Sequence, residues 1–290
     1  MLPGVRIPDR LVESCTGWAA GEAWLSALPA VVDRLRDRWG LDLEAPYEGE
    51  VSVSWVAPAR RRDGSAAVLK VGLPHMEAEH EIDGLRFWDG DPTVRLLDAD
   101  PDANAMLLER CEPGTRLREL PEPEQDEVLA ALLRRLWRRP RAGHPFRSLG
   151  EMIVDWSAGA RANERSWLDP GLVNEGLAMW ESLSRTAALN DDVLLATDLH
   201  AGNVLAAQRE PWLVIDPKPF VGDRAYDPTQ HLFNCLERMQ RDARALVRRL
   251  AELTEVDEER LRSWTFARAV VERGGGDEEA WIEVARSLAP

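Results

Sequence analysis

Three short β-type runs interrupt the helical second half of this 290-residue chain, at residues 193–195, 203–205 and 212–215. Each run is largely apolar and is bounded by polar or turn-forming residues. A few strands embedded in a helical lobe need a functional reason, and the loops beside them supply one.

The loop before the second run reads Thr-Asp-Leu-His-Ala-Gly-Asn and holds Asp198 and Asn203, while Asp216 directly follows the third run. If these two runs pair through a tight turn, Asn203 and Asp216 lie at neighbouring ends of the pair. Their oxygens can then share one Mg²⁺, which prefers oxygen ligands together with water and phosphate. Asp198 would project toward the same point and accept the proton of a substrate hydroxyl. The pattern therefore predicts kinase-type phosphoryl transfer, with Asp198 catalytic and Asn203 and Asp216 as metal ligands.

The first half of the chain has a different pattern. Residues 18–40 have the apolar spacing of an amphipathic helix, and Asp63-Gly64 between two β-type runs predicts a hairpin turn. The first 110 residues or so therefore predict a small antiparallel sheet with one inserted helix. The expected elements after the first helix are strands over 51–56, 66–71, 94–97 and 105–108, and a charged helix over 75–89.

Helix-start signals recur in the second half. Asp169-Pro170 and Asp227-Pro228 each supply an N-cap and a first-turn proline, and Thr254 with Asp257 has the spacing of a capping box. The expected helices cover residues 124–138, 149–165, 169–188 and 227–239, then one carrying Leu261 and Trp264, and a short one after Gly274-Gly275-Gly276.

The charge balance excludes some classes of partner. The chain has 51 acidic and 36 basic residues, a formal net charge of −15. Nucleic acids and anionic membranes need a basic face, so neither is expected as a partner. A cationic small molecule is compatible with this charge, although acidity is commoner as a means of solubility in cytoplasmic proteins.

The cysteines and the apolar runs predict a cytoplasmic protein. Cys15, Cys111 and Cys235 are scattered and have no metal-site spacing, which favours reduced thiols and no structural zinc. Charged residues interrupt the N-terminal apolar run, and no stretch reaches the about 18 apolar residues that a membrane span needs.

Lys70 and Lys218 are the only lysines in a chain that otherwise uses arginine. An ammonium differs from a planar guanidinium in size, hydration and hydrogen-bond geometry. Positions that keep lysine in a chain so strongly biased toward arginine are therefore candidates for specific chemistry.

These motif blocks together resemble the aminoglycoside phosphotransferase branch of the protein-kinase-like fold, in particular the aminoglycoside/hydroxyurea resistance kinases. The resemblance implies an α+β bilobed fold, with a nucleotide-binding lobe over residues 1–109 that includes an N-terminal helical extension. A catalytic and substrate-binding lobe would cover residues 110–290. The blocks that carry the resemblance are residues 65–71, 80–90, 107–114, 194–205, 215–218, 222–223 and 226–228.

The resemblance also implies roles for individual residues. Lys70 would hold the α- and β-phosphates of Mg-bound ATP or GTP, paired with Glu81 or, as a fallback, Glu77. The segment with Glu109 and Cys111 would be the inter-lobe connection that reads adenine through its backbone. Ser52 and Ser54 would replace a glycine-rich loop over the phosphates. Lys218 would contact phosphate or brace the Asp216 loop, and Asp227 would brace the catalytic loop as well as cap a helix.

The sequence leaves the substrate open. The resemblance implies an antibiotic of the streptomycin or hydroxyurea type, and a metabolic small-molecule kinase of the same fold is the alternative. A non-catalytic nucleotide-binding module is the third hypothesis, because Ala196 and Thr197 replace a histidine and glycine that often precede the aspartate. Carboxylates that could line a pocket for a polycationic aminoglycoside are Glu151, Asp155, Glu164, Asp223 and Glu237.

Overall fold

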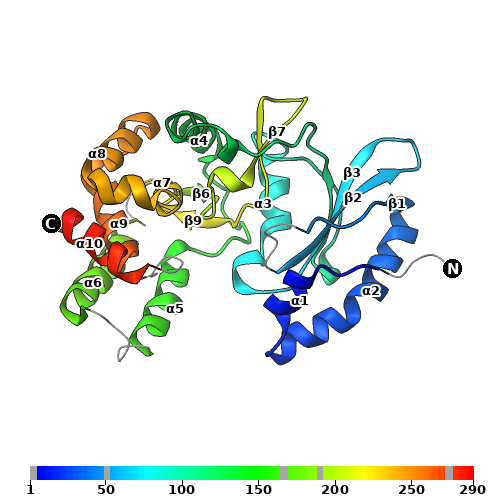
Figure 1. Ribbon diagram of the computed structural model, residues 1–290, viewed down its shortest axis with the longest axis horizontal. Coiled ribbons are helices and arrows are strands. Elements are labelled where there is room, and N and C mark those ends of the chain that lie inside the picture. The colour runs from blue at the N-terminus through cyan, green and yellow to red at the C-terminus, as the bar shows by residue number, and fades with distance from the viewer. Residues whose placement is uncertain (1–4, 49–52, 163–168, 188–191, 272–276) are drawn as a thin grey trace. The chain divides into compact units, whose positions relative to one another are not determined.

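The computed structural model describes residues 5–48, 53–162, 169–187, 192–271 and 277–290 (Figure 1). The chain divides into two compact units, Met1–Gly114 and Thr115–Pro290. The first unit contains a five-stranded antiparallel sheet, and the second is mainly helical with two small two-stranded sheets. This is the expected α+β class.

The sheet of the first unit has the strand order β1-β2-β3-β5-β4. The predicted hairpin is confirmed as β2 and β3, where Ser54 lies opposite Gly72 and Arg60 opposite Ala66. Asp63 accepts hydrogen bonds from the backbone and hydroxyl of Ser65, and Gly64 adopts φ +83°, which completes the turn. The strands are β1 (Leu41–Leu43), β2 (Ser54–Arg61), β3 (Ala66–Gly72), β4 (Leu96–Asp100) and β5 (Ala105–Glu109).

The first unit also contains helices α1 (Asp9–Cys15), α2 (Ala19–Trp39) and α3 (Glu81–Trp88). The predicted first long helix is confirmed as α2, which buries Leu28, Val32 and Leu35 in one cluster with sheet residues such as Leu69. The helix predicted over 75–89 is shorter than expected. A 3-10 turn over Met76–Ala78 and the non-helical His80 precede α3, so the helix begins only at Glu81.

The second unit buries its core between helices. Trp180 and Trp264 are fully buried, as expected for tryptophans that anchor a core. The three predicted runs are confirmed as strands β6, β7 and β8. β7 pairs with β8, whereas β6 pairs with β9, a strand that the sequence analysis did not predict. The helices are α4 (Glu122–Leu136), α5 (Leu149–Ala162), α6 (Pro170–Ala187), α7 (Pro228–Phe233), α8 (Leu236–Thr254), α9 (Glu258–Val271) and α10 (Glu278–Leu288). The strands are β6 (Val193–Leu195), β7 (Val204–Ala206), β8 (Trp212–Val214) and β9 (Phe220–Gly222).

Two helix predictions in this unit are wrong. The helix expected to reach residue 239 ends at Phe233, because Asn234 and Cys235 leave helical geometry before α8 begins. Thr254 does not start α9. It ends α8, and its hydroxyl donates to Leu250 O at 2.5 Å. Asp257 alone caps α9, accepting from Arg260 N at 2.8 Å. The Gly274–Gly276 run lies outside the described residues.

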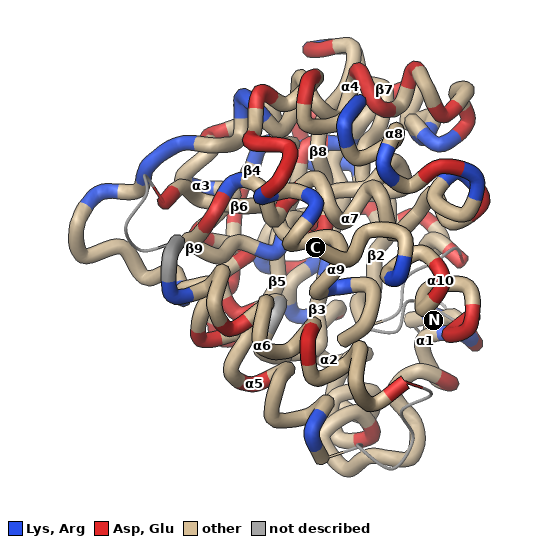
Figure 2. The backbone as a smooth tube through the Cα atoms, turned by 90° about the vertical axis from the view of Figure 1, so that its left-hand side faces the viewer, with Lys and Arg blue, Asp and Glu red and all other residues tan. Residues whose placement is uncertain are grey.

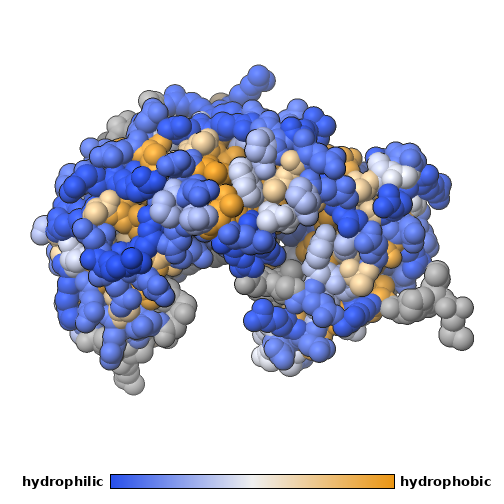
Figure 3. Space-filling model, turned by 45° about the horizontal axis from the view of Figure 1, so that its top comes forward, coloured by the Kyte–Doolittle hydropathy of each residue, from blue (hydrophilic) through white to orange (hydrophobic). Residues whose placement is uncertain are grey.

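Acidic and basic residues both occur throughout the chain. In the view of Figure 2, acidic and basic residues are interspersed along the chain. The face in Figure 3 is mostly hydrophilic, with smaller hydrophobic areas between. Within the described ranges, no helix is long and apolar enough to cross a membrane.

Candidate active site

A buried ion pair joins the sheet of the first unit to α3. Lys70 lies in the central strand β3, opposite Val56 and Met106, and donates from Nζ to both carboxylate oxygens of Glu81 at 2.6 Å. The two side chains are only 7% and 2% exposed. A buried ion pair is stable when both charges are compensated, so Glu81 fixes the position of the ammonium. The side chain of Glu77 is outside what the structure describes.

The other residues of this unit that were predicted to bind the nucleotide are Ser52, Ser54, Glu109 and Cys111. Ser54 begins β2, and Ser52 lies outside the described residues. The carboxylate of Glu109 accepts from Arg95 N at 3.0 Å, so its side chain holds the neighbouring segment. Cys111 is partly buried and is not in a disulfide. The backbone N–H of Glu109 donates to Arg95 O at 2.9 Å, and the backbone contact of this segment with adenine stays a prediction.

In the second unit, a buried carboxylate braces the loop before Asp198. Asp227 is fully buried, and its Oδ1 accepts from Thr197 N at 2.8 Å. Its Oδ2 accepts from Ala196 N at 3.1 Å and from Trp137 Nε1 at 2.9 Å. Burial raises the pKa of Asp227 to about 6, against the lowering effect of these three donors. The expected helix cap is wrong: the side chain of Asp227 makes no cap hydrogen bond to α7, because the loop uses it.

Thr197 has a strained backbone at the centre of this loop. Its φ is +46°, which a β-branched residue rarely adopts, and Asp198 N donates back to Ala196 O at 2.7 Å. The Thr197 hydroxyl donates to Lys218 O at 2.6 Å. Lys218 N also donates to Ala196 O at 2.8 Å. Local strain of this kind persists only where surrounding contacts fix it, and it is concentrated at functional sites.

Asp198 is partly buried and its two carboxylate oxygens differ. Oδ1 accepts from Gln230 Nε2 at 2.7 Å, whereas Oδ2 has a longer contact of 3.4 Å from Asn203 Nδ2. Burial raises the pKa of Asp198 above its ordinary value, and the neighbouring charge of Asp216 adds to this. The charges of His200, Lys218 and Arg268 act in the opposite direction. A carboxylate with a raised pKa in a fixed position suits proton transfer.

Asn203 and Asp216 flank the β7–β8 hairpin as expected. Val204 pairs with Val214, and Ile215 N donates to Asn203 O at 2.9 Å. Asn203 Nδ2 donates to Asp198 O at 3.0 Å, which directs its Oδ1 away from that carbonyl. Asp216 adopts φ +53°, and its Oδ1 accepts from Lys218 Nζ at 2.6 Å.

Asn203 and Asp216 supply few ligands for a metal site that is built from protein groups alone. Within the described ranges, no group of three or more His, Cys, Asp or Glu side chains could hold a metal ion. One aspartate carboxylate and one amide oxygen nevertheless fit Mg²⁺, which keeps several waters and takes phosphate oxygens from a nucleotide.

The carboxylates proposed for a cationic substrate are mostly engaged elsewhere. Glu151 accepts from Ser148 N at 2.9 Å at the start of α5, and Asp155 pairs with Arg147 at 3.1 Å. Asp223 accepts from Trp264 Nε1 at 2.6 Å and from Arg260. Glu237 is exposed, and Glu164 lies outside the described residues. Of these carboxylates, Asp223 lines a cavity, where Arg224 and Arg260 are also in the wall.

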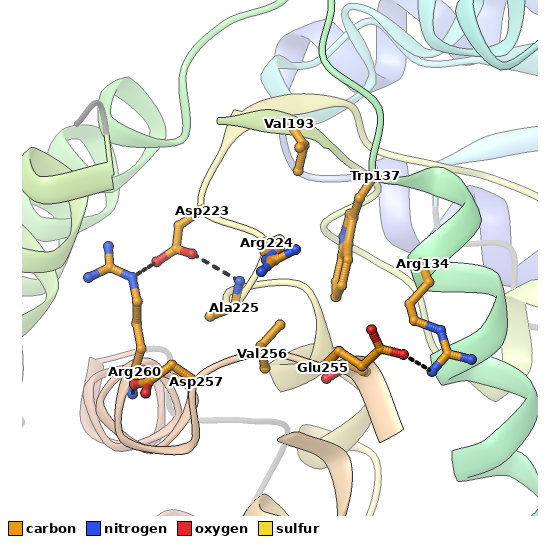
Figure 4. Close-up of a pocket in the computed structure, with 11 residues that line it drawn as sticks. Arg134, Trp137, Val193, Asp223, Arg224, Ala225, Glu255, Val256, Asp257 and Arg260 are labelled. Atoms are coloured by element: carbon orange, nitrogen blue, oxygen red, sulfur yellow. Dashed lines mark hydrogen bonds and ion pairs between the residues drawn. The ribbon is translucent and has the colours of Figure 1, made fainter. Parts of the chain in front are cut away.

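The second unit also contains a cavity of about 490 Å³ (Figure 4). Trp137, Asp223, Arg224 and Val256 are among the residues that line it, and Asp198, Asn203 and Asp216 are not. Trp137 links the cavity wall to Asp227.

Sequence reasoning missed Trp137, Gln230 and Arg268. Gln230 lies within one turn of the Tyr-Asp-Pro block, but a lone glutamine on a helix has no feature that marks it. Arg268 is one of many arginines, and Trp137 one of 12 tryptophans.

A buried lysine–glutamate pair in a sheet-containing unit, with an aspartate–asparagine loop and a following aspartate in a helical unit, defines a phosphotransferase of the protein-kinase-like fold. A solved aminoglycoside phosphotransferase, APH(4)-Ia with ADP and hygromycin B, shares this fold with a TM-score of 0.58. It is 18% identical and the match covers 90% of this chain and 99% of that one. The chain belongs to the aminoglycoside/hydroxyurea antibiotic resistance kinase family, whose sequence model matches residues 39–276.

Two curated relatives match over most of their length. The chain is 40% identical over 280 residues to a streptomycin 6-kinase of Streptomyces griseus, which covers 91% of this chain and 88% of that protein. It is 38% identical over 274 residues to a hydroxyurea phosphotransferase of Kitasatospora aureofaciens, with 92% and 78% covered. The family resemblance expected from the sequence is therefore confirmed, and as a kinase the chain uses a nucleotide as phosphoryl donor.

Proposed function

We propose that this protein inactivates an antibiotic by transferring the γ-phosphoryl group of Mg-bound ATP to one of its hydroxyls. The observation that carries the proposal is the placement of Asp198: a partly buried carboxylate with a raised pKa, on a loop braced by Asp227. A cytoplasmic location agrees with this function, because ATP is available there and none of the three cysteines is in a disulfide.

Asp198 acts as the proton acceptor. The substrate hydroxyl oxygen forms a bond to the γ-phosphorus, the bond from that phosphorus to the β–γ bridging oxygen breaks, and ADP leaves. The hydroxyl proton passes to the Asp198 carboxylate. Because the transition state is loose, positioning and charge stabilisation contribute most of the rate.

Lys70 and Glu81 form the nucleotide site of the first unit. The ammonium of Lys70 contacts the α- and β-phosphates, and Glu81 keeps it in place. The backbone of the segment with Glu109 and Cys111 would bind the adenine edge. Ser54 would contact the phosphates together with Ser52, which lies outside the described residues.

Asn203 and Asp216 would hold Mg²⁺. The amide oxygen of Asn203 is directed away from Asp198 O, and Asp216 offers its carboxylate beside Lys218. When bound, the ion would neutralise charge that develops on the phosphate oxygens. Lys218 partly balances the charge of Asp216 before the nucleotide arrives.

Streptomycin is the first candidate substrate and hydroxyurea the second. The relatives that act on them are 40% and 38% identical to this chain, so identity alone does not separate the two. The formal net charge of −15 complements a polycationic aminoglycoside and gives no such advantage to neutral hydroxyurea.

A coupled assay of ADP release tests the proposal with streptomycin, other aminoglycosides and hydroxyurea in parallel. Asp198→Asn is the matched control, and loss of the general base should lower turnover by about 10²-fold or more. Streptomycin-dependent ADP release that Asp198→Asn abolishes supports the proposal. Absence of turnover with the whole panel, or wild-type turnover in Asp198→Asn, would overturn it.

A further inference from the structure

We propose that Gln230 and Arg268 are positioning residues that orient the carboxylate of Asp198 for phosphoryl transfer. The inference rests on the proposed function, since it takes Asp198 as the proton acceptor. It adds two residues from separate helices, α7 and α9, that act through Asp198.

The first step is the short hydrogen bond to Asp198. Gln230 Nε2 donates to Oδ1 at 2.7 Å, while in the described part of the chain the hydrogen bond to Oδ2 is the long 3.4 Å contact from Asn203. Oδ1 is therefore fixed by Gln230. Oδ2 keeps acceptor capacity for an incoming hydroxyl.

The second step fixes the Gln230 amide itself. Arg268 donates from one terminal nitrogen to Gln230 Oε1 at 2.7 Å and from the other to Thr229 Oγ1 at 2.6 Å. A guanidinium only donates and an ionised carboxylate only accepts. A flipped amide would therefore face donor to donor at Arg268 and acceptor to acceptor at Asp198. The arginine thus forces the amide nitrogen toward Asp198.

The third step fixes Arg268. Its residue is 3% exposed, and its guanidinium carbon lies 4.6 Å from the ring centroid of Tyr226 and 4.7 Å from that of Phe233. These rings are themselves held by Trp264 in an edge contact at 5.3 Å and by Trp281 in a stack at 4.5 Å. A planar guanidinium between two rings cannot be replaced by a lysine without loss of this geometry.

The variant Gln230→Glu distinguishes a positioning role of Gln230 from a packing role. Glutamate keeps the side-chain volume and can still bond Arg268, but it presents an oxygen where Asp198 needs a donor. A packing role predicts that Gln230→Glu is milder than Gln230→Ala. A positioning role predicts the reverse: a kcat about 10²-fold below wild type for Gln230→Glu and about tenfold below for Gln230→Ala, with KM for the nucleotide changed less than about threefold. Gln240→Glu, the same change at an exposed position on α8, should match wild type.

Arg268→Lys tests the link to Asp198. If Arg268 acts through Gln230, then Arg268→Lys lowers kcat in the wild-type background and adds little in the Gln230→Ala background. Full additivity of the two changes, or an order in which Gln230→Ala is worse than Gln230→Glu, would overturn the proposal. Thermal unfolding of each variant shows whether it is folded.

A measurement made without substrate distinguishes failure of this inference from failure of the proposed function. The side-chain amide protons of Gln230, assigned by their loss in Gln230→Ala, should shift in the ¹⁵N NMR spectra of both Asp198→Ala and Arg268→Lys. Unshifted signals in both variants would overturn the inference. If the signals shift but no panel antibiotic is phosphorylated, the proposed function fails while the contact stands.

Discussion

The ammonium of Lys218 donates to Oδ1 of Asp216 across 2.6 Å, and the pair is partly buried, with side chains 11% and 36% exposed. The backbone of the same lysine contacts Ala196 and Thr197. One residue therefore links the segment that carries Asp216 to the loop that carries Asp198. The backbone contacts would form with any residue at this position, so the lysine side chain itself contributes the contact with Asp216.

Lys218→Met should lower kcat by about tenfold or more, because Asp216 loses its partner charge. The positive charge of Lys218 lowers the pKa of Asp198. Without that charge the pKa of Asp198 rises, so the acid limb of the kcat/KM profile should move to higher pH in Lys218→Met. Lys218→Arg keeps the charge and should leave the acid limb close to that of wild type. The measurement is the pH dependence of kcat/KM for all three proteins, and identical profiles would contradict the prediction.

Glu81→Gln should destabilise the protein by about 3 kcal/mol, because it removes the carboxylate charge that faces the buried ammonium of Lys70. Lys70→Met combined with Glu81→Leu removes both charges and should recover most of the stability. Activity should stay lost in the double variant, since the phosphate contact is gone. Urea unfolding and the kinase assay measure the two effects. Recovery of both together would show that the pair has only a structural role.

Asp227 should make stability depend on pH. Its pKa is about 6 in the folded state and near the ordinary 3.8 when unfolded, so the folded protein binds more protons between these values. The contribution of this group to stability is therefore fully present below about pH 4 and is lost as the pH rises through about 6. Asp227→Asn should remove this slope and, by weakening the loop brace, lower kcat. Urea unfolding from pH 4 to 7 tests the slope, and an unchanged slope would be the contrary result.

Thr197 offers a test of backbone strain. Thr197→Gly relieves the strained φ of +46° but loses the hydroxyl bond to Lys218, so its stability should be within about 1 kcal/mol of wild type. Thr197→Val keeps the strain and loses the bond, and it should cost about 1–3 kcal/mol. Thermal unfolding ranks the three proteins. A Thr197→Val protein as stable as wild type would rule out a stabilising role for the hydroxyl.

Local sequence signals predicted most of the helices and strands correctly. The alternation around Asp63-Gly64 predicted the β2–β3 hairpin, and the short apolar runs predicted β7 and β8, since hairpins depend on neighbours in the chain. Helix boundaries were less predictable. Thr254 and Asp257 have the spacing of a capping box, but Glu255 at φ +60° ends α8 between them, and only tertiary packing decides such a break.

Asp198, Asn203 and Asp216 could be singled out from the sequence as candidates for the chemistry, because they lie close along the chain and in a recognisable spacing. The tertiary structure decided how Asp198 is held. Trp137, Asp227, Gln230 and Arg268 come from α4, α7 and α9 or their flanking residues, up to 131 positions apart, and only folding brings them together. A hydrogen bond depends on distance in space, so contacts between distant segments leave no spacing in the sequence to find.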